Sequence, residues 1–393
     1  MRRAFIIVLD SFGIGEMPDA YRFHDEGSNT ICSVSSSKYF FAPTLQSLGL
    51  FNIEGVKASV SSIEAPKGAY LRLEELSPGK DTTTGHWEMA GIVASKPFPT
   101  YPNGFPKEII NELEKKFNRK ILCNKPYSGT EVIKDYGDMH IKSGALIVYT
   151  SADSVLQIAA HEDLIPLDEL YRYCKIAREV MCGKHAVGRI IARPFVGTSG
   201  NYTRTANRHD FSLMPPKNTM LNVLAKSGHD VIAVGKINDI FAKSGITRAY
   251  TSKNNHQGME ITLDIQKQDF DGLCFVNLVD FDMLYGHRND VDGYAKAISD
   301  FDIQLKEFIK NMKKDDILLV TADHGCDPLT PSTDHSREYV PLIIYGDKIK
   351  PVDLKTRRGF DWISGTILEY FNIRDKDMKK SLFNEVYDVS GID

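Results

Sequence analysis

Two residues of the kind that bind metal ions, Asp323 and His324, stand side by side directly after a short apolar run. The run, Ile317 to Val320, predicts a buried parallel strand, and open α/β sheets bind ligands beyond the carboxyl ends of such strands. A carboxylate beside an imidazole suits a divalent ion of the manganese or zinc type better than calcium, and Gly325 lets the backbone turn away without a Cβ clash. Taken alone, the pair fits a polar turn with a capping aspartate equally well.

Two further apolar runs end in residues of the same kind. Ala4 to Leu9 is followed by Asp10, and Leu273 to Val279 is followed by Asp282 and His287. Because parallel strands present their carboxyl ends at one edge of a sheet, we expect these side chains to meet the first pair. The candidate ligands are three carboxylates and three imidazoles: Asp10, Asp282, His287, Asp323, His324 and His335. Any one histidine would more often be a surface or core residue, but six ligands together are enough for two divalent ions.

Two glycine-containing stretches bear on phosphate binding. GIGEMPDA, after Asp10, lacks both the G-x-G-x-x-G spacing and the Walker lysine, so a nucleotide-binding fold is rejected. GKDTTTGHWEMAG, from Gly79 to Gly91, places three threonines at an expected helix start, where free backbone N–H groups favour a phosphate. From these residues alone, helix capping explains the threonines at least as well.

The elements that must position these residues alternate between strands and helices. After residue 216 we expect helices over Met220–Lys226 and Tyr294–Met312, and strands over Val231–Val234, Leu273–Val279, Ile317–Val320 and Val340–Tyr345. Short helical or loop segments are expected at 29–37 and 43–49. This alternation predicts an α/β core, a doubly wound and mainly parallel sheet with helices on both faces.

Two proline-rich breaks divide the chain. KPFPTYPNGFP, from Lys96 to Pro106, holds four prolines and a glycine, and a second break lies at Met214–Thr219. Between them the pattern is α+β, with helices expected over 107–117 and 167–181 and strands over 145–149 and 189–192. The 393 residues exceed the roughly 250–300 that one core serves. We therefore expect an inserted domain, residues 97–215, between core pieces 1–96 and 216–393.

Composition and charge narrow the class of protein. Hydrophobic content of 42% and charged content of 25% are ordinary for a soluble enzyme, and a net charge of -4 argues against nucleic-acid binding. The first apolar run ends at Asp10 after six residues, too short for a signal peptide, and no stretch approaches a membrane span. Six cysteines without a C-x-x-C pair predict reduced thiols and a cytoplasmic protein. Cys326, beside the metal residues, is a further candidate ligand, although carboxylates and imidazoles suffice. The expected partner is a small molecule.

Segments along the whole chain resemble the alkaline phosphatase superfamily and, more closely, its phosphopentomutase family. They are VLDSFGIGEMPDA, GKDTTTGHWEMAG, SADSVLQIAAHE, VGRIIARPFVG, NYTRTANRHDF, VGKINDIF, NLVDFDMLYGHRND, TADHGCDP and TDHSREYVP. The resemblance implies an alkaline phosphatase-like fold and two ions of the manganese type. One ion would be held by Asp10, Asp323 and His324. The other would be held by Asp282, His287 and His335.

Thr82 matches the phosphorylated threonine that lies between the two ions in the family, although Thr83 and Thr84 leave the choice of hydroxyl open. A threonine hydroxyl is a poor nucleophile at neutral pH, which explains the need for cations. The resemblance implies interconversion of ribose 1-phosphate and ribose 5-phosphate, and of the 2-deoxyribose pair, through phosphothreonine and a pentose 1,5-bisphosphate. A sugar bisphosphate would activate the enzyme, and the inserted domain would act as a cap that retains the intermediate.

Substrate contacts are also implied by the resemblance. Ser151 and Asp153 match positions near the pentose hydroxyls, and Arg189, Arg204 and Lys236 match positions at the distal phosphate. Residues beside these motifs are further candidates: Arg193, Arg208 and His209. A phosphatase or another metal-dependent phosphomutase of the superfamily would share the metal ligands but need other cap residues. A metal-stabilised binding protein would need no nucleophile, and the GKDTTTGHWE stretch argues against it.

Overall fold

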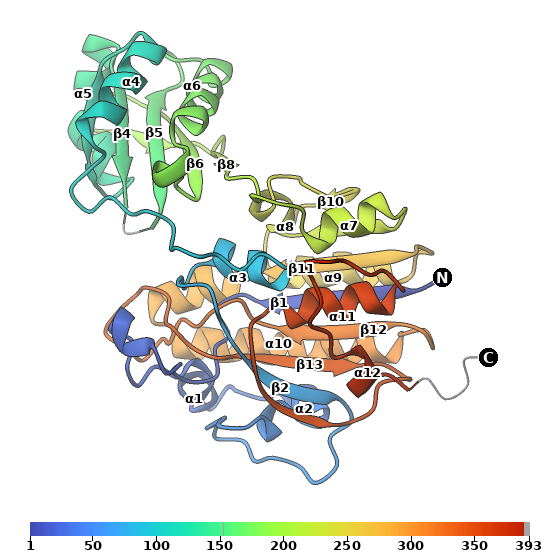
Figure 1. The fold of residues 1–393 in the computed structure, drawn as a ribbon. Helices are drawn as coiled ribbons and strands as arrows, with labels where there is room; N and C mark the ends of the chain where they lie inside the picture. The colour runs from blue at the N-terminus through green and yellow to red at the C-terminus, as the bar shows by residue number, and fades with distance from the viewer. Residues whose placement is uncertain (152, 389–393) are drawn as a thin grey trace. The chain divides into compact units, whose positions relative to one another are not determined.

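A computed structural model of the protein describes residues 1–151 and 153–388. The chain divides into two compact units, which are described separately below. The core unit comprises Met1–Lys96 and Pro215–Asp393, and the inserted unit comprises Pro97–Met214 (Figure 1). The inserted unit ends one residue before the boundary expected from the sequence.

The core unit is built on an eight-stranded sheet with the order β10-β9-β11-β1-β12-β13-β2-β14. Its strands are β1 (Arg3–Leu9), β2 (Ala69–Glu74), β9 (Asp230–Val234), β10 (Arg248–Tyr250), β11 (Gly272–Leu278), β12 (Ile317–Thr321), β13 (Val340–Tyr345) and β14 (Asp353–Arg358). Among these strands, only the pairings of β13 with β12 and β2 are antiparallel. The prediction of a mainly parallel α/β sheet is confirmed.

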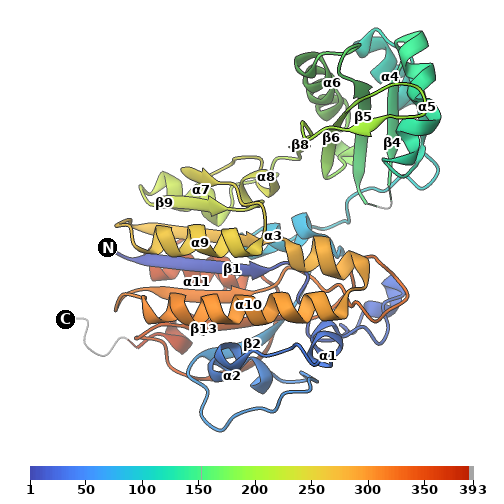
Figure 2. The ribbon, with the colours of Figure 1, turned by 180° about the vertical axis from the view of Figure 1, so that it is seen from behind.

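Helices cover both faces of this sheet. One face carries α1 (Thr30–Ser35), α2 (Pro43–Leu48), α9 (Asn255–Gln266) and α10 (Val291–Lys310), seen in front in Figure 2. The other carries α3 (Thr82–Met89), α7 (Met220–Lys226), α8 (Ile237–Ile240) and α11 (Trp362–Tyr370), followed by α12 (Phe383–Val386). Within the described ranges, no helix is both long and apolar enough to cross a membrane.

The central strands β1, β11 and β12 place the candidate ligands. Each is buried along its whole length, because helices lie above and below it. In the register of the sheet, Val8 lies opposite both Asn277 and Thr321. The three strands therefore end at the same level, and the segments that follow them leave the sheet at one edge.

The inserted unit is an α+β sandwich around a mixed sheet with the order β3-β4-β5-β6-β7, in which β8 also pairs with β6. Its strands are β3 (Ile121–Pro126), β4 (Leu146–Thr150), β5 (Val155–His161), β6 (Arg189–Val196), β7 (Thr203–Arg204) and β8 (His209–Ser212). Its helices are α4 (Lys107–Phe117), α5 (Glu131–Ser143) and α6 (Leu167–Val180). One sheet face packs on α4 and α6, and the other packs partly on α5.

Candidate metal centre

The six predicted ligands meet at the edge of the core sheet where β1, β11 and β12 end. Their ligand atoms form overlapping groups in which all atoms lie within 4.8 Å of one another. These groups are Asp10 with Asp323 and His324, Asp282 with His324 and His335, and Asp282 with His287 and Cys326. Shared members join the groups, so the six side chains form one continuous cluster.

The distances within the cluster divide it into two parts. His324 Nε2 lies 3.5 Å from Asp10 Oδ1 and 3.3 Å from Asp323 Oδ2. On the other side, Asp282 lies between two imidazoles, with His287 Nε2 at 3.2 Å and His335 Nε2 at 3.3 Å. The first part contains the three residues of one set that the resemblance implies. In the second part Asp282 lies close to both His287 and His335, but His324 also groups with Asp282 and His335, so the division of ligands between two ions stays a prediction.

Several cluster atoms are buried without a hydrogen-bond partner in the described part of the chain: Asp10 Oδ1, Asp282 Oδ1, Asp323 Oδ2 and His335 Nε2. A buried polar atom left without a partner costs about 1–3 kcal/mol. The second oxygens of two carboxylates are held, since Asn277 Nδ2 donates to Asp10 Oδ2 at 2.9 Å and the Ser11 N–H donates to Asp323 Oδ1 at 3.0 Å. The other oxygens, Asp10 Oδ1, Asp282 Oδ1 and Asp323 Oδ2, each lie within 3.5 Å of a cluster imidazole, so the ligand atoms are gathered as a bound cation requires.

Backbone carbonyls orient two of the imidazoles. Nδ1 of His287 donates to Thr333 O at 2.6 Å, and Nδ1 of His324 donates to Gly325 O at 3.1 Å. A carbonyl oxygen accepts but does not donate, so Nδ1 carries the proton in both rings. The Nε2 atoms therefore carry the lone pairs, and they lie beside carboxylates of the cluster: His287 Nε2 is 3.2 Å from Asp282 Oδ2, and His324 Nε2 is 3.3 Å from Asp323 Oδ2. This is the usual arrangement for ligating histidines.

The charges in the cluster also favour cations. Burial raises the pKa of Asp10 well above its usual value, and the nearby carboxylates of Asp323 and Asp282 raise it further. Burial alone would also raise the pKa of Asp282, but His335 and His287 hold it well below its usual value. Three carboxylates gathered in a buried site therefore need positive charge nearby.

Cys326 lies beside the second part of the cluster but is a poor ligand. Its Sγ donates to Asp334 O at 3.5 Å. Burial raises the pKa of the thiol, and the neighbouring carboxylates and imidazoles are the ligands that hard divalent ions prefer. The described residues thus fit two divalent ions held by oxygen and nitrogen atoms.

Thr82, the predicted nucleophile, begins helix α3 at the edge of the cluster. Its Oγ1 lies 3.3 Å from His324 Nε2. The helix is capped by Asp81, whose carboxylate accepts from the Thr84 N–H at 3.0 Å and from the Thr84 hydroxyl. Capping therefore does not occupy the Thr82 hydroxyl, and Thr84 is turned away from the cluster.

Gly85 allows α3 to pack directly on the end of β12. A Cβ at this position would lie 2.3 Å from Asp323 O. We expect Gly85→Ala to displace the helix, lower the free energy of unfolding by about 1–3 kcal/mol and weaken Mn²⁺ binding. Denaturant unfolding and Mn²⁺ titration measure both effects, with Gly188→Ala as control, because a Cβ there would make its nearest contact at 3.4 Å. Equal behaviour of the two variants would contradict the close-packing explanation.

Gly325 also avoids a clash, but not because of an unusual backbone turn. A Cβ on Gly325 would lie 2.5 Å from Glu338 Oε1. Glu338 is buried and accepts hydrogen bonds from the Gly15 N–H at 3.0 Å and the Thr30 N–H at 2.9 Å. The carboxylate thus packs beneath the segments that carry Asp10 and Asp323.

Most of the predicted substrate residues lie in the inserted unit. Side chains alternate along β6, so Arg189 and Arg193 share the face opposite to α4 and α6. Arg189 Nη2 lies 3.5 Å from Asp153 Oδ2, and Arg193 Nε donates to Gln157 Oε1 at 2.9 Å. Arg204 pairs with Phe195 across β6 and β7, which places it on the same face. We call this side of the sheet, which carries Arg189, Arg193 and Arg204, the arginine face.

Two of the further candidates differ in their placement. Arg208 donates two hydrogen bonds to Asp210, both at 2.7 Å, at the border of the arginine face. His209 belongs to the opposite face, where the centre of its ring lies 5.3 Å from the ring centre of Tyr171 and 4.6 Å from that of Phe211. Alternation along β8 thus separates His209 from the arginines.

The remaining predicted contacts are Ser151 and Lys236. Ser151 is half-buried between β4 and β5. Lys236 belongs to the core unit, where its Nζ lies 3.4 Å from Met283 Sδ, next to Asp282 in the chain. Its positive charge lowers the pKa of Asp10, opposing the effect of burial. Lys236 therefore lies near the metal cluster.

Sequence reasoning missed several polar residues. Tyr149 lies on the arginine face, fully buried, and its hydroxyl has no hydrogen-bond partner within residues 1–151 and 153–388. Its hydroxyl and the Arg204 guanidinium both lie beside Gly129. In the core, Asn277 and His86 lie directly behind the ligands. Two signals were available: Asn277 interrupts an apolar strand, and His86 follows Thr82 by one helical turn.

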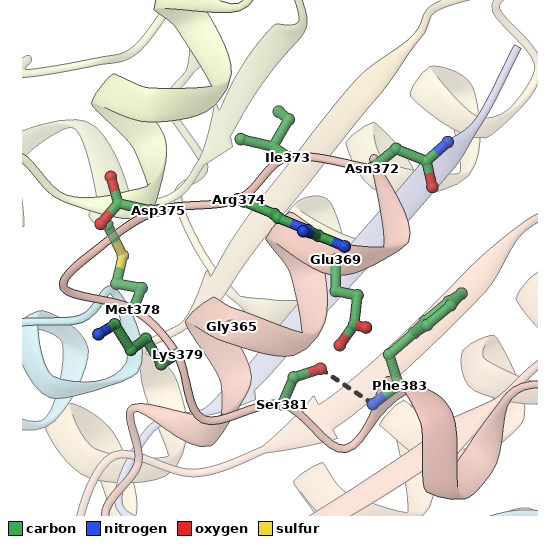
Figure 3. A pocket seen from close by; sticks show the side chains of 10 residues that line it. All are labelled: Gly365, Glu369, Asn372, Ile373, Arg374, Asp375, Met378, Lys379, Ser381 and Phe383. Atoms are coloured by element: carbon green, nitrogen blue, oxygen red, sulfur yellow. Dashed lines mark hydrogen bonds between the residues drawn. The ribbon is translucent and has the colours of Figure 1, made fainter.

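A separate cavity of about 620 Å³ lies beside α11 and α12, lined by residues that include Glu369, Arg374 and Lys379 (Figure 3). It shares no lining residue with the metal cluster. We therefore assign it no part in the candidate site.

Comparisons with known proteins agree with a metal-binding site in this chain. The family model described as the Metalloenzyme superfamily matches residues 2–375. A phosphopentomutase of Lachnoclostridium phytofermentans is 60% identical over 386 residues, covering 98% of this chain and 99% of that protein. A phosphopentomutase of Clostridium acetobutylicum is 54% identical, covering 97% and 98%. The solved structure of a Leishmania mexicana phosphoglycerate mutase matches the fold with a TM-score of 0.50 at 13% identity, covering 98% of each chain.

The fold, the buried ligand cluster and the family match define the class: a metalloenzyme with a mainly parallel α/β core. The two relatives are similar over nearly their whole length. The chain belongs to the phosphopentomutase family of isomerases, so the resemblance inferred from the sequence motifs is confirmed.

Proposed function

We propose that this enzyme interconverts ribose 1-phosphate and ribose 5-phosphate, and likewise the 2-deoxyribose pair, through phosphorylated Thr82 and a pentose 1,5-bisphosphate. The observation that carries the proposal is the position of the Thr82 hydroxyl, 3.3 Å from His324 Nε2, in a cluster where several buried ligand atoms have no hydrogen-bond partner among the described residues. The names of the two relatives support the choice of pentose phosphates. The six free cysteines accord with the cytoplasmic location predicted from the sequence.

The metal cluster fits two divalent ions, which we propose to be Mn²⁺. Asp10, Asp323 and His324 would hold one, and Asp282, His287 and His335 would hold the other. When bound, such ions neutralise the charge of phosphoryl oxygens and lower the pKa of a hydroxyl. Asp10, Asp282, His287, Asp323 and His324 follow the ends of the buried strands β1, β11 and β12, so the fold of the core unit brings them together before substrate arrives.

Thr82 carries the phosphoryl group between the two halves of the reaction. Its place at the start of α3 puts the phosphate among free backbone N–H groups of the helix. In the first half, the bond from phosphorus to Thr82 Oγ1 breaks as a bond to the free sugar hydroxyl forms, and the hydroxyl proton passes to Oγ1. The bisphosphate then turns round, and its other phosphoryl group returns to Thr82. A dephosphorylated enzyme therefore needs a sugar bisphosphate to start.

The arginine face is proposed to hold the phosphate that is not reacting. Arginine offers two parallel N–H donors, which match two oxygens of a phosphate. In the described structure Arg189 is only loosely paired with Asp153, at 3.5 Å, and with Asp210, at 3.7 Å. Both contacts are longer than a strong ion pair, so the guanidinium can turn to an incoming phosphate. Ser151 and Asp153 are proposed to contact the pentose hydroxyls.

The reaction is tested by phosphorus NMR of ribose 5-phosphate with enzyme, Mn²⁺ and a catalytic amount of sugar bisphosphate. We expect the ribose 1-phosphate signal to appear without loss of total sugar phosphate. Accumulation of inorganic phosphate without ribose 1-phosphate would instead identify a phosphatase of the same superfamily.

Loss of an arginine that binds substrate should weaken retention of the sugar bisphosphate and leave the metal centre intact. Arg204→Ala or Arg189→Ala removes a charge-assisted contact of roughly 1.5–3 kcal/mol, or about 10- to 150-fold in affinity. We expect the variants to need correspondingly more sugar bisphosphate to stay phosphorylated, while Mn²⁺ affinity is unchanged. Arg172→Ala is the control, because Arg172 is exposed on α6 and lies outside the arginine face. Unchanged bisphosphate dependence together with lost metal binding would show a structural role.

A further inference from the structure

We infer that His86 and Asn277 are positioning residues that hold Asp10, Asp323 and the backbone of Thr82 in one arrangement. The inference rests on the proposed function, because it assigns a support to the carboxylates of the first metal site. Both side chains are fully buried and lie behind the ligands.

His86 joins the nucleophile to one of the ligands. It follows Thr82 by one turn of α3, and its Nδ1 lies 2.8 Å from Thr82 O and 3.2 Å from Asp323 Oδ2. Its ring is stacked on Phe275, with 5.9 Å between ring centres and an angle of 28°. The ring therefore has a fixed orientation in which one nitrogen faces both the carbonyl and the carboxylate.

Asn277 joins His86 to the other ligand. Its Nδ2 donates to Asp10 Oδ2 at 2.9 Å and lies 3.4 Å from His86 Nε2. The amide oxygen, Asn277 Oδ1, has no hydrogen-bond partner in the part of the chain that the structure describes. The side chain is thus held through its amide nitrogen, which lies between Asp10 and His86.

The donor and acceptor pattern of this link is determined by Asp10. A carboxylate that binds a metal ion is ionised and only accepts hydrogen bonds, so the amide must turn its Nδ2 toward Asp10. The second N–H then faces His86 Nε2, which must accept, and the His86 proton is placed on Nδ1. From Nδ1 it is donated to Thr82 O beside Asp323. A chain of contacts therefore runs from Asp10 through Asn277 and His86 to Asp323 and Thr82.

This arrangement matters because the carboxylates of Asp10 and Asp323 repel each other. Contacts behind metal ligands orient them, and losing such a contact typically costs 10- to 100-fold in metal affinity. His86 also contacts the residue whose hydroxyl is to be phosphorylated. Loss of the link should therefore weaken the first ion and leave the second, which Asp282, His287 and His335 would hold, largely unaffected.

The experiment measures Mn²⁺ binding to metal-free full-length protein by calorimetry and by electron paramagnetic resonance. We expect wild type to bind two ions, and His86→Phe and Asn277→Leu to bind one of them about 10- to 100-fold more weakly. His140→Phe is a matched control: His140 is a fully buried histidine in the inserted unit, with Nδ1 at 2.6 Å from Ala145 O and Nε2 accepting from the His161 N–H. It should lose stability without losing metal affinity.

Two conservative variants distinguish positioning from packing. His86→Asn places an amide N–H where Nδ1 lies, whereas His86→Gln reaches toward the position of Nε2. We expect near wild-type Mn²⁺ affinity for His86→Asn and reduced affinity for His86→Gln. This comparison decides the matter even if His86→Phe does not fold.

The outcomes separate this inference from the proposed function. If wild type binds fewer than two ions, the proposed metal centre itself is wrong. If wild type binds two ions and both Asn277→Leu and His86→Gln bind them as tightly as wild type, the metal centre stands and the positioning role of His86 and Asn277 is overturned.

Discussion

Thr82→Ala should abolish phosphorylation of the enzyme by a sugar bisphosphate and lower mutase turnover by roughly four orders of magnitude or more. The reason is that neither of the other two threonines in the first turn of α3 offers an equivalent hydroxyl. Thr84 donates its hydroxyl to Asp81, and Thr83 is buried. Thr82 instead places its hydroxyl against the metal cluster, 3.3 Å from His324 Nε2.

Peptide mass mapping after incubation with the bisphosphate measures this directly. Thr83→Ala is the control and should still be labelled on Thr82. Thr82→Ser, which keeps a hydroxyl, should retain part of the labelling. Label recovered on Thr83 or Thr84 of the wild-type enzyme would show that a different hydroxyl carries the phosphoryl group.

Removal of divalent metal should abolish turnover, and Mn²⁺ should restore it. The cluster holds three carboxylates and three imidazoles, and several of its buried atoms have no partner among the described residues. Without cations these groups leave both the phosphoryl charge and the Thr82 hydroxyl unsupported. Dialysis against a chelator followed by Mn²⁺ addition, with activity measured at each step, tests the dependence. Full activity in rigorously metal-free protein would contradict the two-metal site.

Single substitutions test which ligands share an ion. Asp323→Ala should weaken mainly the ion held with Asp10, and His335→Ala mainly the ion held with Asp282. The distances support this division, since His324 Nε2 lies 3.3 Å from Asp323 Oδ2 and His335 Nε2 lies 3.3 Å from Asp282 Oδ1. Calorimetric titration of each variant should show one affected and one unaffected ion. Equal weakening of both ions by each substitution would argue for a different sharing of ligands.

Local patterns in the sequence were enough to place the main strands of the core. The runs expected at 4–9, 273–279 and 317–320 correspond to β1, β11 and β12, and each agrees with its strand to within one residue at both ends. Such strands are buried on both faces, so nearly every residue is apolar and the signal is strong. The helix expected at 107–117 matches α4, because its apolar residues recur with a helical period and Asn118 ends it in the left-handed conformation.

Other elements were missed where the local signal is weaker. β2 alternates buried and half-buried residues, and Arg72 and Glu74 make it look like a surface loop. α5 contains a glycine, Gly137, which lies close to Tyr202 from β6–β7 and lowers helix propensity. The reversed direction of β13 also escaped prediction. The segment between β12 and β13 contains no described helix, so it returns the chain antiparallel instead of crossing over to a parallel strand.

The sequence by itself determined the kinds of ligand, their position after strands, and the family. Ligand type depends on side-chain chemistry, and position after a strand depends on local hydrophobicity, so both are visible in short segments. Only the tertiary structure decided which buried ligand atoms have no hydrogen-bond partner among the described residues. It also decided that Thr82 rather than Thr84 faces the cluster, and that His86 and Asn277 lie behind it. These depend on contacts such as that between Asn277 and Asp10, which are distant in the chain and adjacent only across β1 and β11. Hydrogen bonds between neighbouring strands follow from register, and register is set by the packing of the whole sheet.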